Sequence, residues 1–291
     1  MKHFTIPLAL AAIIAASCSV KDDRLACTVP VSIHVNAFSV TQEGASRTKA
    51  PQDPAAYGNV KAMDLAFFGP DGTKMFAATQ LKDDSSTYDT FGEFSCRLPV
   101  GAYTMVVIAR YVGNGDVFTL TSPTEASFSD KPRETFVTTQ EVSVTEDAPL
   151  DLDVTLNRIV SYLNVISTDG RPAEATKMRV SFSKGGKDFN PSTGLALSDA
   201  GFSQVFNPSA AVGTTINVSA CPFLITDEET MTVTLSALDA SDNVLITKTV
   251  PNVPFKRNRT TILTGAVYTP GVSTAGFQLE TEWLDSETVN F

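Results

Sequence analysis

Few residues of this chain have the types and spacing that chemistry requires. His34 is the only histidine besides His3, so a Ser-His-Asp triad or a histidine-rich metal site is hard to build. The segment Ser183-Lys184-Gly185-Gly186-Lys187 lacks the spacing of a phosphate-binding loop and fits a hairpin loop. Three acidic pairs could bind calcium or carry solvated charge, and we favour solvated charge: Asp22-Asp23, Asp83-Asp84 and Glu228-Glu229. The sequence therefore predicts no catalytic residue, no metal site and no cofactor, and a protein that is not an enzyme.

The exception is Cys18, which stands directly after the small residues Ala15-Ala16-Ser17. Before it come the basic residue Lys2 and an apolar run from Phe4 to Ala16. This run is shorter than the ~20 apolar residues that span a bilayer. The order of positive charge, apolar run and small residues is typical of a secretory signal peptide. We therefore assign residues 1–17 to a signal peptide that is removed.

The small residues followed by Cys18 resemble the lipobox of bacterial lipoproteins, in which the cysteine is acylated and becomes the new N-terminus. Ala15 stands where that pattern has a large aliphatic residue. The resemblance implies a palmitate-type chain on Cys18 and a lipidated linker, residues 18–28, at the outer membrane. Lys21-Asp22-Asp23 resembles the segment that directs such lipoproteins to the outer surface. An ordinary signal peptide with a chance cysteine is the alternative.

The composition restricts the partners and the redox chemistry. Lys and Arg number 22 against 32 Asp and Glu, a net charge of −10. Such an acidic chain is a poor partner for nucleic acid, which requires clustered basic residues. No second long apolar run follows the first, so no transmembrane helix is expected. Cys27, Cys96 and Cys221 share no Cys-x-x-Cys spacing, and an odd number cannot complete a disulfide framework. Cys96 lies on the apolar face of an alternating run and is predicted to be a buried thiol.

Alternation of apolar and polar residues with period two dominates the chain and predicts β-strands. The first run, Val29–Val40, places Val31, Ile33, Val35 and Ala37 on one face. Residues 41–57 are rich in Gly, Ser, Lys and Pro and predict a long exposed loop. Further strands are predicted at Met63–Phe67, Phe94–Leu98, Tyr103–Tyr111, Thr135–Val144 and Leu150–Leu156, with a turn at residues 69–72.

The alternating pattern restarts near residue 157, where we place a domain boundary. Strands are then predicted at Met178–Phe182, Ile216–Ala220, Met231–Leu238, Val244–Val250, Thr261–Tyr268 and in the alternation from Phe277 to Trp283. Pro251–Arg259 is predicted to be a bulky turn. Short strands about ten residues apart predict an all-β chain with two tandem antiparallel β-sandwich domains, residues 29–156 and 157–291.

Five features occur in a fixed order along the chain. They are Lys21–Cys27 after Cys18, Asp64–Gly72 with its Asp-Gly turn, the Leu-Pro-x-Gly-x-Tyr run Leu98–Thr104, Arg158, and the Arg-Asn-x-x-Thr run Arg257–Gly265. Together they resemble the fimbrillin-type (type V) pilus subunits, and most closely the branch that contains the lipoprotein anchors of these fimbriae. The resemblance implies two transthyretin-like β-sandwich domains and a cell-surface location in the fimbrium.

The resemblance also implies partners and sites. Subunits of this family assemble with other fimbrial subunits by strand addition, in which an extended segment completes a neighbour's sheet. In stalk subunits a protease removes the first strand after an arginine, whereas anchors retain it. The removable strand would carry Val31, Ile33, Val35 and Ala37. Arg47 would be the cleavage site, or a plain loop arginine, and Val289 with Phe291 would form the donor strand.

The sequence thus predicts a structural subunit of fimbriae, either the anchor or an accessory (tip) component. The alternative from another class is a surface glycan-binding lipoprotein of a nutrient-uptake system, which would read sugars with exposed aromatic residues. Trp283 is the only tryptophan, and its alternation with Phe277 and Leu279 is that of a core residue, which weighs against this alternative. A third interpretation is a secreted structural domain with no role in assembly.

Overall fold

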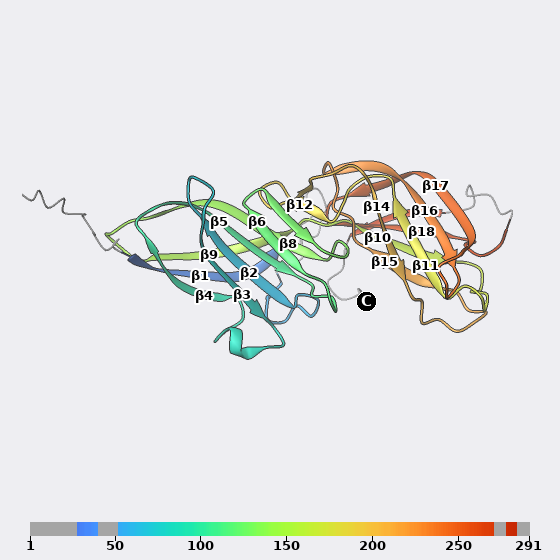
Figure 1. Cartoon of the computed structure of the whole chain (residues 1–291), viewed down its shortest axis with the longest axis horizontal. Coiled ribbons are helices and arrows are strands. Elements are labelled where there is room, and N and C mark those ends of the chain that lie inside the picture. The colour runs from blue at the N-terminus through green and yellow to red at the C-terminus, as the bar shows by residue number, and fades with distance from the viewer. Residues whose placement is uncertain (1–27, 40–51, 271–277, 284–291) are drawn as a thin grey trace, which may run out of the picture.

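The computed structural model describes residues 28–39, 52–270 and 278–283 of the 291-residue chain. β-strands form most of this part, so the predicted all-β class is confirmed. Figure 1 shows an elongated molecule with residues 28–158, the first half, at one end and residues 159–283, the second half, at the other. Within the described residues, no helix is long and apolar enough to cross a membrane.

The first half is a β-sandwich whose two layers belong to one continuous sheet. Its strands are β1 (Thr28–Ser39), β2 (Ala62–Phe68), β3 (Lys74–Leu81), β4 (Glu93–Pro99), β5 (Gly101–Arg110), β8 (Thr135–Val144) and β9 (Leu150–Arg158), with a 3₁₀ turn η1 (Ser85–Thr87). The strand order is β3-β2-β5-β8-β9-β1-β4. The sheet bends between β8 and β9, where only Phe136↔Arg158 and Val137↔Asn157 pair. Apolar side chains of both layers fill the core between them.

The second half repeats this topology with two separate sheets. Its strands are β10 (Tyr162–Ser167), β11 (Lys177–Phe182), β14 (Phe202–Phe206), β15 (Asn217–Ala220), β16 (Glu228–Leu238), β17 (Val244–Lys256), β18 (Arg259–Gly265) and β19 (Gln278–Trp283). The orders are β14-β11-β16-β17 and β15-β10-β18-β19. β10 runs parallel to β18 and antiparallel to β15, as β1 runs parallel to β9 and antiparallel to β4. β19 adds a strand on the free side of β18.

A small sheet, which we call the junction sheet, joins the two halves. It contains β6 (Phe118–Ser122), β7 (Glu125–Phe128), β12 (Asp188–Asn190) and β13 (Leu195–Ala196), in the order β13-β12-β7-β6. Phe128 from the first half stacks on Phe189 and Phe223 from the second, with ring centroids 6.4 and 6.2 Å apart. Because this cluster covers the outer face of β2, that strand is buried on both faces.

Most predicted strands are confirmed, and β8 has the predicted bounds. Two predictions about turns are wrong. Pro251–Arg259 is no bulky turn, since β17 continues to Lys256 and the turn contains Arg257 and Asn258. β17 lies at a sheet edge, where proline costs no ladder hydrogen bond. Residues 183–187 do not close a hairpin, because they lead from β11 to β12 in a different sheet.

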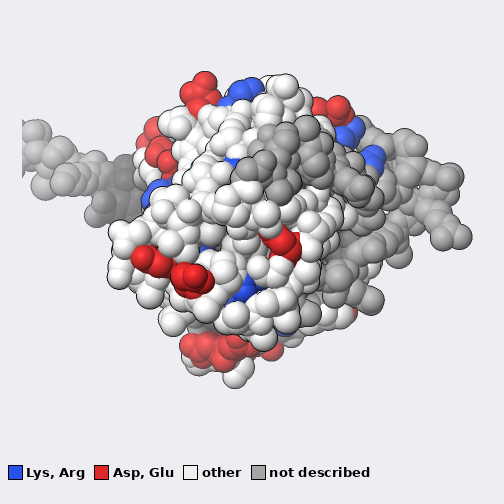
Figure 2. Space-filling view, turned by 90° about the vertical axis from the view of Figure 1, so that its right-hand side faces the viewer, with Lys and Arg blue, Asp and Glu red and all other residues white. Residues whose placement is uncertain are grey.

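Figure 2 looks at the end of the molecule that the second half forms. Acidic and basic groups on the described part of this face are scattered, with uncharged surface between them. A face of this kind has no dense cluster of basic groups to hold a polyanion.

Candidate functional site

The first strand, β1, lies inside its layer rather than at its edge. It pairs antiparallel with β4 from Thr28↔Pro99 to His34↔Glu93. On its other side it pairs parallel with β9, from Val31↔Leu150 to Ser39↔Asn157. Among the described strands, β4 has no other neighbour in the sheet. Removal of β1 would therefore leave a gap with two unpaired backbone edges.

The inner face of β1 belongs to the core of the first half. Val31, Ile33 and Val35 are buried, as predicted. The prediction that Ala37 continues this face is wrong, because the pairing register with β9 shifts between Val35 and Ala37. The irregularity turns Phe38 inward instead, and Phe38 is completely buried while Ala37 is partly exposed.

Phe38 also closes the base of the loop that follows β1. Its backbone N–H donates to the carbonyl oxygen of Gln52 at 2.9 Å, and the N–H of Gln52 donates back at 3.1 Å. The rings of Phe38 and Phe136 stack with centroids 4.6 Å apart, and Tyr57 packs edge-on against both. Tyr57 is thus buried, although the sequence places it in an exposed loop. Arg47, the predicted cleavage site, lies outside the described residues.

The outer face of β1 carries His34 between two carboxylates. Its Nδ1 contacts Glu93 of β4, and its Nε2 lies 2.7 Å from Asp151 of β9. The hydrogen bond with Glu93 is the largest effect and raises the pKa of His34 above its ordinary value. Burial lowers this pKa by less, and the hydrogen bond with Asp151 raises it again. Asp153 is the register partner of His34 on β9. The protonated imidazole therefore connects β1 to both of its neighbours.

A buried polar cluster, the junction cluster, connects β1's loop with both halves. The Arg158 guanidinium lies 3.1 Å from the carboxylate of Glu134, and both side chains are at most 1% exposed. Tyr57 donates to the same carboxylate at 2.6 Å, and Arg158 donates to the side chain of Asn258 at 3.0 Å. Asn258 has a φ of 58°, which an asparagine tolerates better than most residues. Four segments distant in sequence meet at this cluster.

Beside this cluster, residues of both halves line a pocket of about 390 Å³. Gln204, Glu134 and Cys221 are among its buried residues, whereas Asn207 and Asn217 lie at its exposed rim. Alternation does not reveal this pocket, because its residues come from loops and strands that are distant in sequence. Only Gln204 stands out in the sequence, as a polar residue close to Phe202, Val205 and Phe206, whereas Glu134 follows a charged stretch.

Two thiols of the described residues are free, Cys96 on β4 of the first half and Cys221 in the second half. Burial raises the pKa of Cys96 to about 11, as expected for a half-buried thiol on β4, and that of Cys221 to about 12. Neither is therefore a thiolate at neutral pH. The other predicted sites, Cys18 for the lipid and Val289 with Phe291 for the donor strand, lie outside the described residues, as does Cys27.

The acidic pairs that remain in the described part have protein partners. Asp83 faces Lys61, and Asp84 caps the turn η1. Glu228 pairs with Lys256, while Glu229 accepts the backbone N–H of Ile225 at 2.7 Å. Within the described residues no group of three or more His, Cys, Asp or Glu side chains could hold a metal ion.

Solved structures share this fold. A proposed adhesin from Bacteroides ovatus has a TM-score of 0.54 at 12% sequence identity, over 85% of this chain and 92% of the other. A proposed polysaccharide-binding protein (DUF1812) from Bacteroides thetaiotaomicron has a TM-score of 0.53 at 12% identity, over 90% and 100%. The fimbrial anchor protein Mfa2 from Porphyromonas gingivalis has a TM-score of 0.50 at 11% identity, over 82% and 91%. At such identities the similarity shows the fold.

Sequence comparison adds a family match. Residues 25–287 match the model of a family of unknown function (DUF6562). No curated protein is significantly similar to the chain in sequence. The matched residues include both halves and the junction sheet between them.

Proposed function

The chain belongs to the DUF6562 family, and we propose that it is a structural subunit of cell-surface fimbriae, acting as the anchor or as an accessory (tip) component. Its role is to bind other fimbrial subunits by strand addition and to hold them at the outer membrane through a lipid on Cys18. This role requires no catalysis. The solved structures with the same fold include proposed adhesins and a fimbrial anchor protein, which supports the proposal.

The observation that carries the proposal is the position of β1 between β9 and β4. Five of its side chains are buried in the core of the first half: Val29, Val31, Ile33, Val35 and Phe38. At ~1.5–3 kcal/mol for each buried apolar side chain, they contribute on the order of 10 kcal/mol. A segment with the same alternation could replace β1 and regain most of this free energy together with the backbone hydrogen bonds.

The segment after β1 is compatible with both possibilities for this strand, retention in an anchor and release after cleavage in an exchanging subunit. The Phe38–Gln52 bridge holds the loop's two ends together, so a cut between them would leave β1 attached only by non-covalent contacts. An uncut chain would keep β1 and its lipid on one polypeptide. Cleavage after Arg47 therefore distinguishes an exchanging subunit from an anchor.

The experiment compares intact masses of the chain from outer membranes and from sheared fimbriae. For an anchor we expect acylated Cys18 at the N-terminus and a retained β1. For an accessory subunit we expect a chain that begins after Arg47, a start that Arg47→Ala abolishes and the control Lys49→Ala does not. In a strain that lacks the chain, fimbriae should be lost from the cell or change in length. Unchanged fimbriae, together with absence of the chain from the sheared fraction, would contradict the proposal.

A further inference from the structure

The pocket beside the junction cluster has two buried polar atoms without partners in the described part of the chain. The Gln204 side chain is 3% exposed, and its Nε2 has no hydrogen-bond partner. Glu134 is 1% exposed; its Oε1 contacts Tyr57 and Arg158, but its Oε2 has no partner. Both residues line the pocket. A buried donor and acceptor left unpaired are costly, so their presence indicates a bound polar group.

One wall of the pocket carries a cation that no carboxylate of the described residues pairs. The Lys131 ammonium lies over the ring of Phe206, 5.2 Å from its centroid, and is half-buried. Burial lowers the pKa of Lys131, and the nearby Arg133 lowers it further. The Lys131 ammonium has three N–H donors for an oxygen atom in the pocket.

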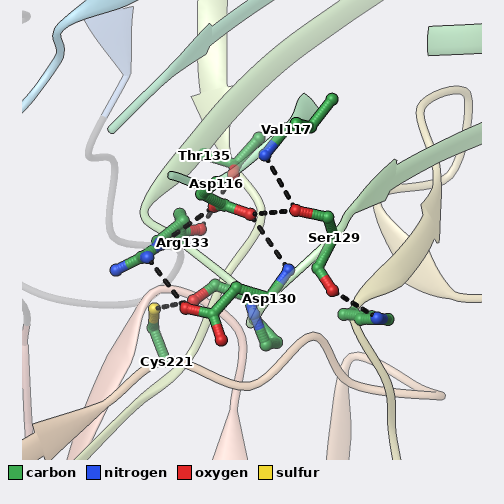
Figure 3. A network of polar contacts seen from close by, with 9 residues as sticks. Asp116, Val117, Ser129, Asp130, Arg133, Thr135 and Cys221 are labelled. Carbon is green, nitrogen blue, oxygen red and sulfur yellow. Dashed lines mark hydrogen bonds and ion pairs between the residues drawn. The ribbon is translucent and has the colours of Figure 1, made fainter. Parts of the chain in front are cut away.

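Arg133 itself is not available to bind an anion. Its guanidinium donates to Asp116 and to Asp130, each at 3.1 Å (Figure 3). Asp116 in turn accepts from the hydroxyl of Ser129 and the N–H of Asp130, both at 3.0 Å. The network fixes Arg133 and neutralises its charge at the pocket.

The rim adds uncharged groups that both donate and accept. Asn114 lies between β5 and β6, Asn207 follows β14, and Asn217 begins β15; all three are exposed and line the pocket. Each carboxamide offers two donors and one acceptor oxygen. The rim is therefore suited to several hydroxyl groups at once.

These observations exclude most ligand classes. An anion would face the buried carboxylate of Glu134, and a cation would face Lys131. An apolar molecule would leave Gln204 and Glu134 unpaired. A hydroxyl group satisfies both, because it can donate to the Glu134 carboxylate and accept from the Gln204 amide. The volume of about 390 Å³ is within the range of small-molecule sites.

We propose that this pocket binds a neutral saccharide unit, with Gln204, Glu134 and Lys131 contacting hydroxyl or ring oxygens inside it and the rim carboxamides contacting the rest. The site differs from a flat surface of exposed aromatic residues, since its selectivity comes from buried polar groups. The proposal does not depend on the fimbrial role, because the pocket lies at the junction and β1 does not line it.

The test measures binding of D-glucose, D-galactose, D-mannose and N-acetylglucosamine to the full mature protein by saturation-transfer NMR and calorimetry. Glucuronate and glucosamine serve as charged counterparts. Gln204→Leu removes the buried amide, and Gln140→Leu, outside the pocket, is its matched control. Lys131→Met is compared with Lys177→Met in the same way. Asn207→Ala and Asn217→Ala change only exposed rim residues, so they test the site even if a buried substitution impairs folding.

We expect at least one neutral sugar to bind, and its Kd to rise about five- to tenfold in Gln204→Leu. A smaller rise is expected in each rim variant, and no change in either control. Backbone amide shifts of the wild-type protein should move around Asn207 and Asn217. The proposal is overturned if no neutral sugar binds, so that the pocket holds water only. It is equally overturned if a charged counterpart binds more tightly, or if the pocket variants bind like the wild type.

Discussion

Replacement of Arg158 by methionine tests whether the junction cluster stabilises the fold. The Arg158 side chain is completely buried, and its guanidinium is the cation beside the Glu134 carboxylate. Methionine keeps much of the volume but leaves Glu134 as a buried charge without its cation. Removal of one partner from a buried pair costs ~3–5 kcal/mol. The substitution also removes the contact of the guanidinium with the Phe136 ring, 4.9 Å from its centroid.

The assay is urea unfolding followed by far-ultraviolet circular dichroism. We expect a lower midpoint and a free energy of unfolding reduced by ~3–5 kcal/mol, a large part of the ~5–15 kcal/mol typical of native proteins. The control Arg179→Met, which replaces a partly exposed arginine on β11, should change it by less than about 0.5 kcal/mol. The double substitution Arg158→Met with Glu134→Gln removes the unpaired charge of Glu134 and should restore part of the lost free energy of unfolding.

A loss below about 1 kcal/mol in Arg158→Met would refute this reasoning, because such a value is typical of a solvent-exposed pair. A double variant less stable than Arg158→Met would also refute it. That result would mean that the Glu134 charge stabilises the fold without the arginine.

Three further predictions concern other parts of the chain. The pKa of His34 is raised, so its contribution to stability should be complete below its ordinary pKa of 6.5 and lost as pH rises through the raised value. The difference in unfolding free energy between the wild type and His34→Gln should therefore be present near pH 6 and vanish near pH 9. Cys18→Ala should abolish incorporation of labelled fatty acid, and unchanged labelling would exclude lipidation at this residue. A fragment of residues 157–291 should unfold cooperatively in urea, because it contains the whole core cluster of the second half. It should also bind a hydrophobic dye, because Phe189 and Phe223 lose the first-half residues that cover them. A disordered fragment would contradict the domain boundary.

The strands that the sequence reveals are those with one face in a core. β1, the end of β8 and the start of β16 alternate clearly, because there one side of the strand is buried and the other is more exposed. The sequence does not predict β3, because this edge strand buries a polar residue. That residue is Gln80, whose side chain donates a hydrogen bond to the backbone carbonyl of Glu93. β14 is short and pairs only with β11, so it gives too few alternating positions to recognise.

The junction could not be predicted from local pattern. β7 and β12 pair although about sixty residues separate them, and each is too short to show a period. The junction cluster likewise collects Tyr57, Glu134, Arg158 and Asn258 from four segments. In the sequence, the family resemblance marks Arg158 and Asn258 but gives no physical reason for their positions. The structure supplies one, since they bond to each other between the two halves.

The repeated topology places two equivalent strands in the described part of the chain, one in each half. β10 occupies the same place in the second half as β1 in the first, between a parallel and an antiparallel neighbour. β10, however, follows directly after Ile159 and Val160, which are buried in the junction core, and its first residue, Tyr162, is buried there too. Release of β10 would therefore break the contacts that join the halves. β1 contributes no residue to that core, and its Phe38 packs instead against Phe136 and against Tyr57 of the junction cluster. Of the two strands, β1 is the one whose release would leave the apolar junction core intact.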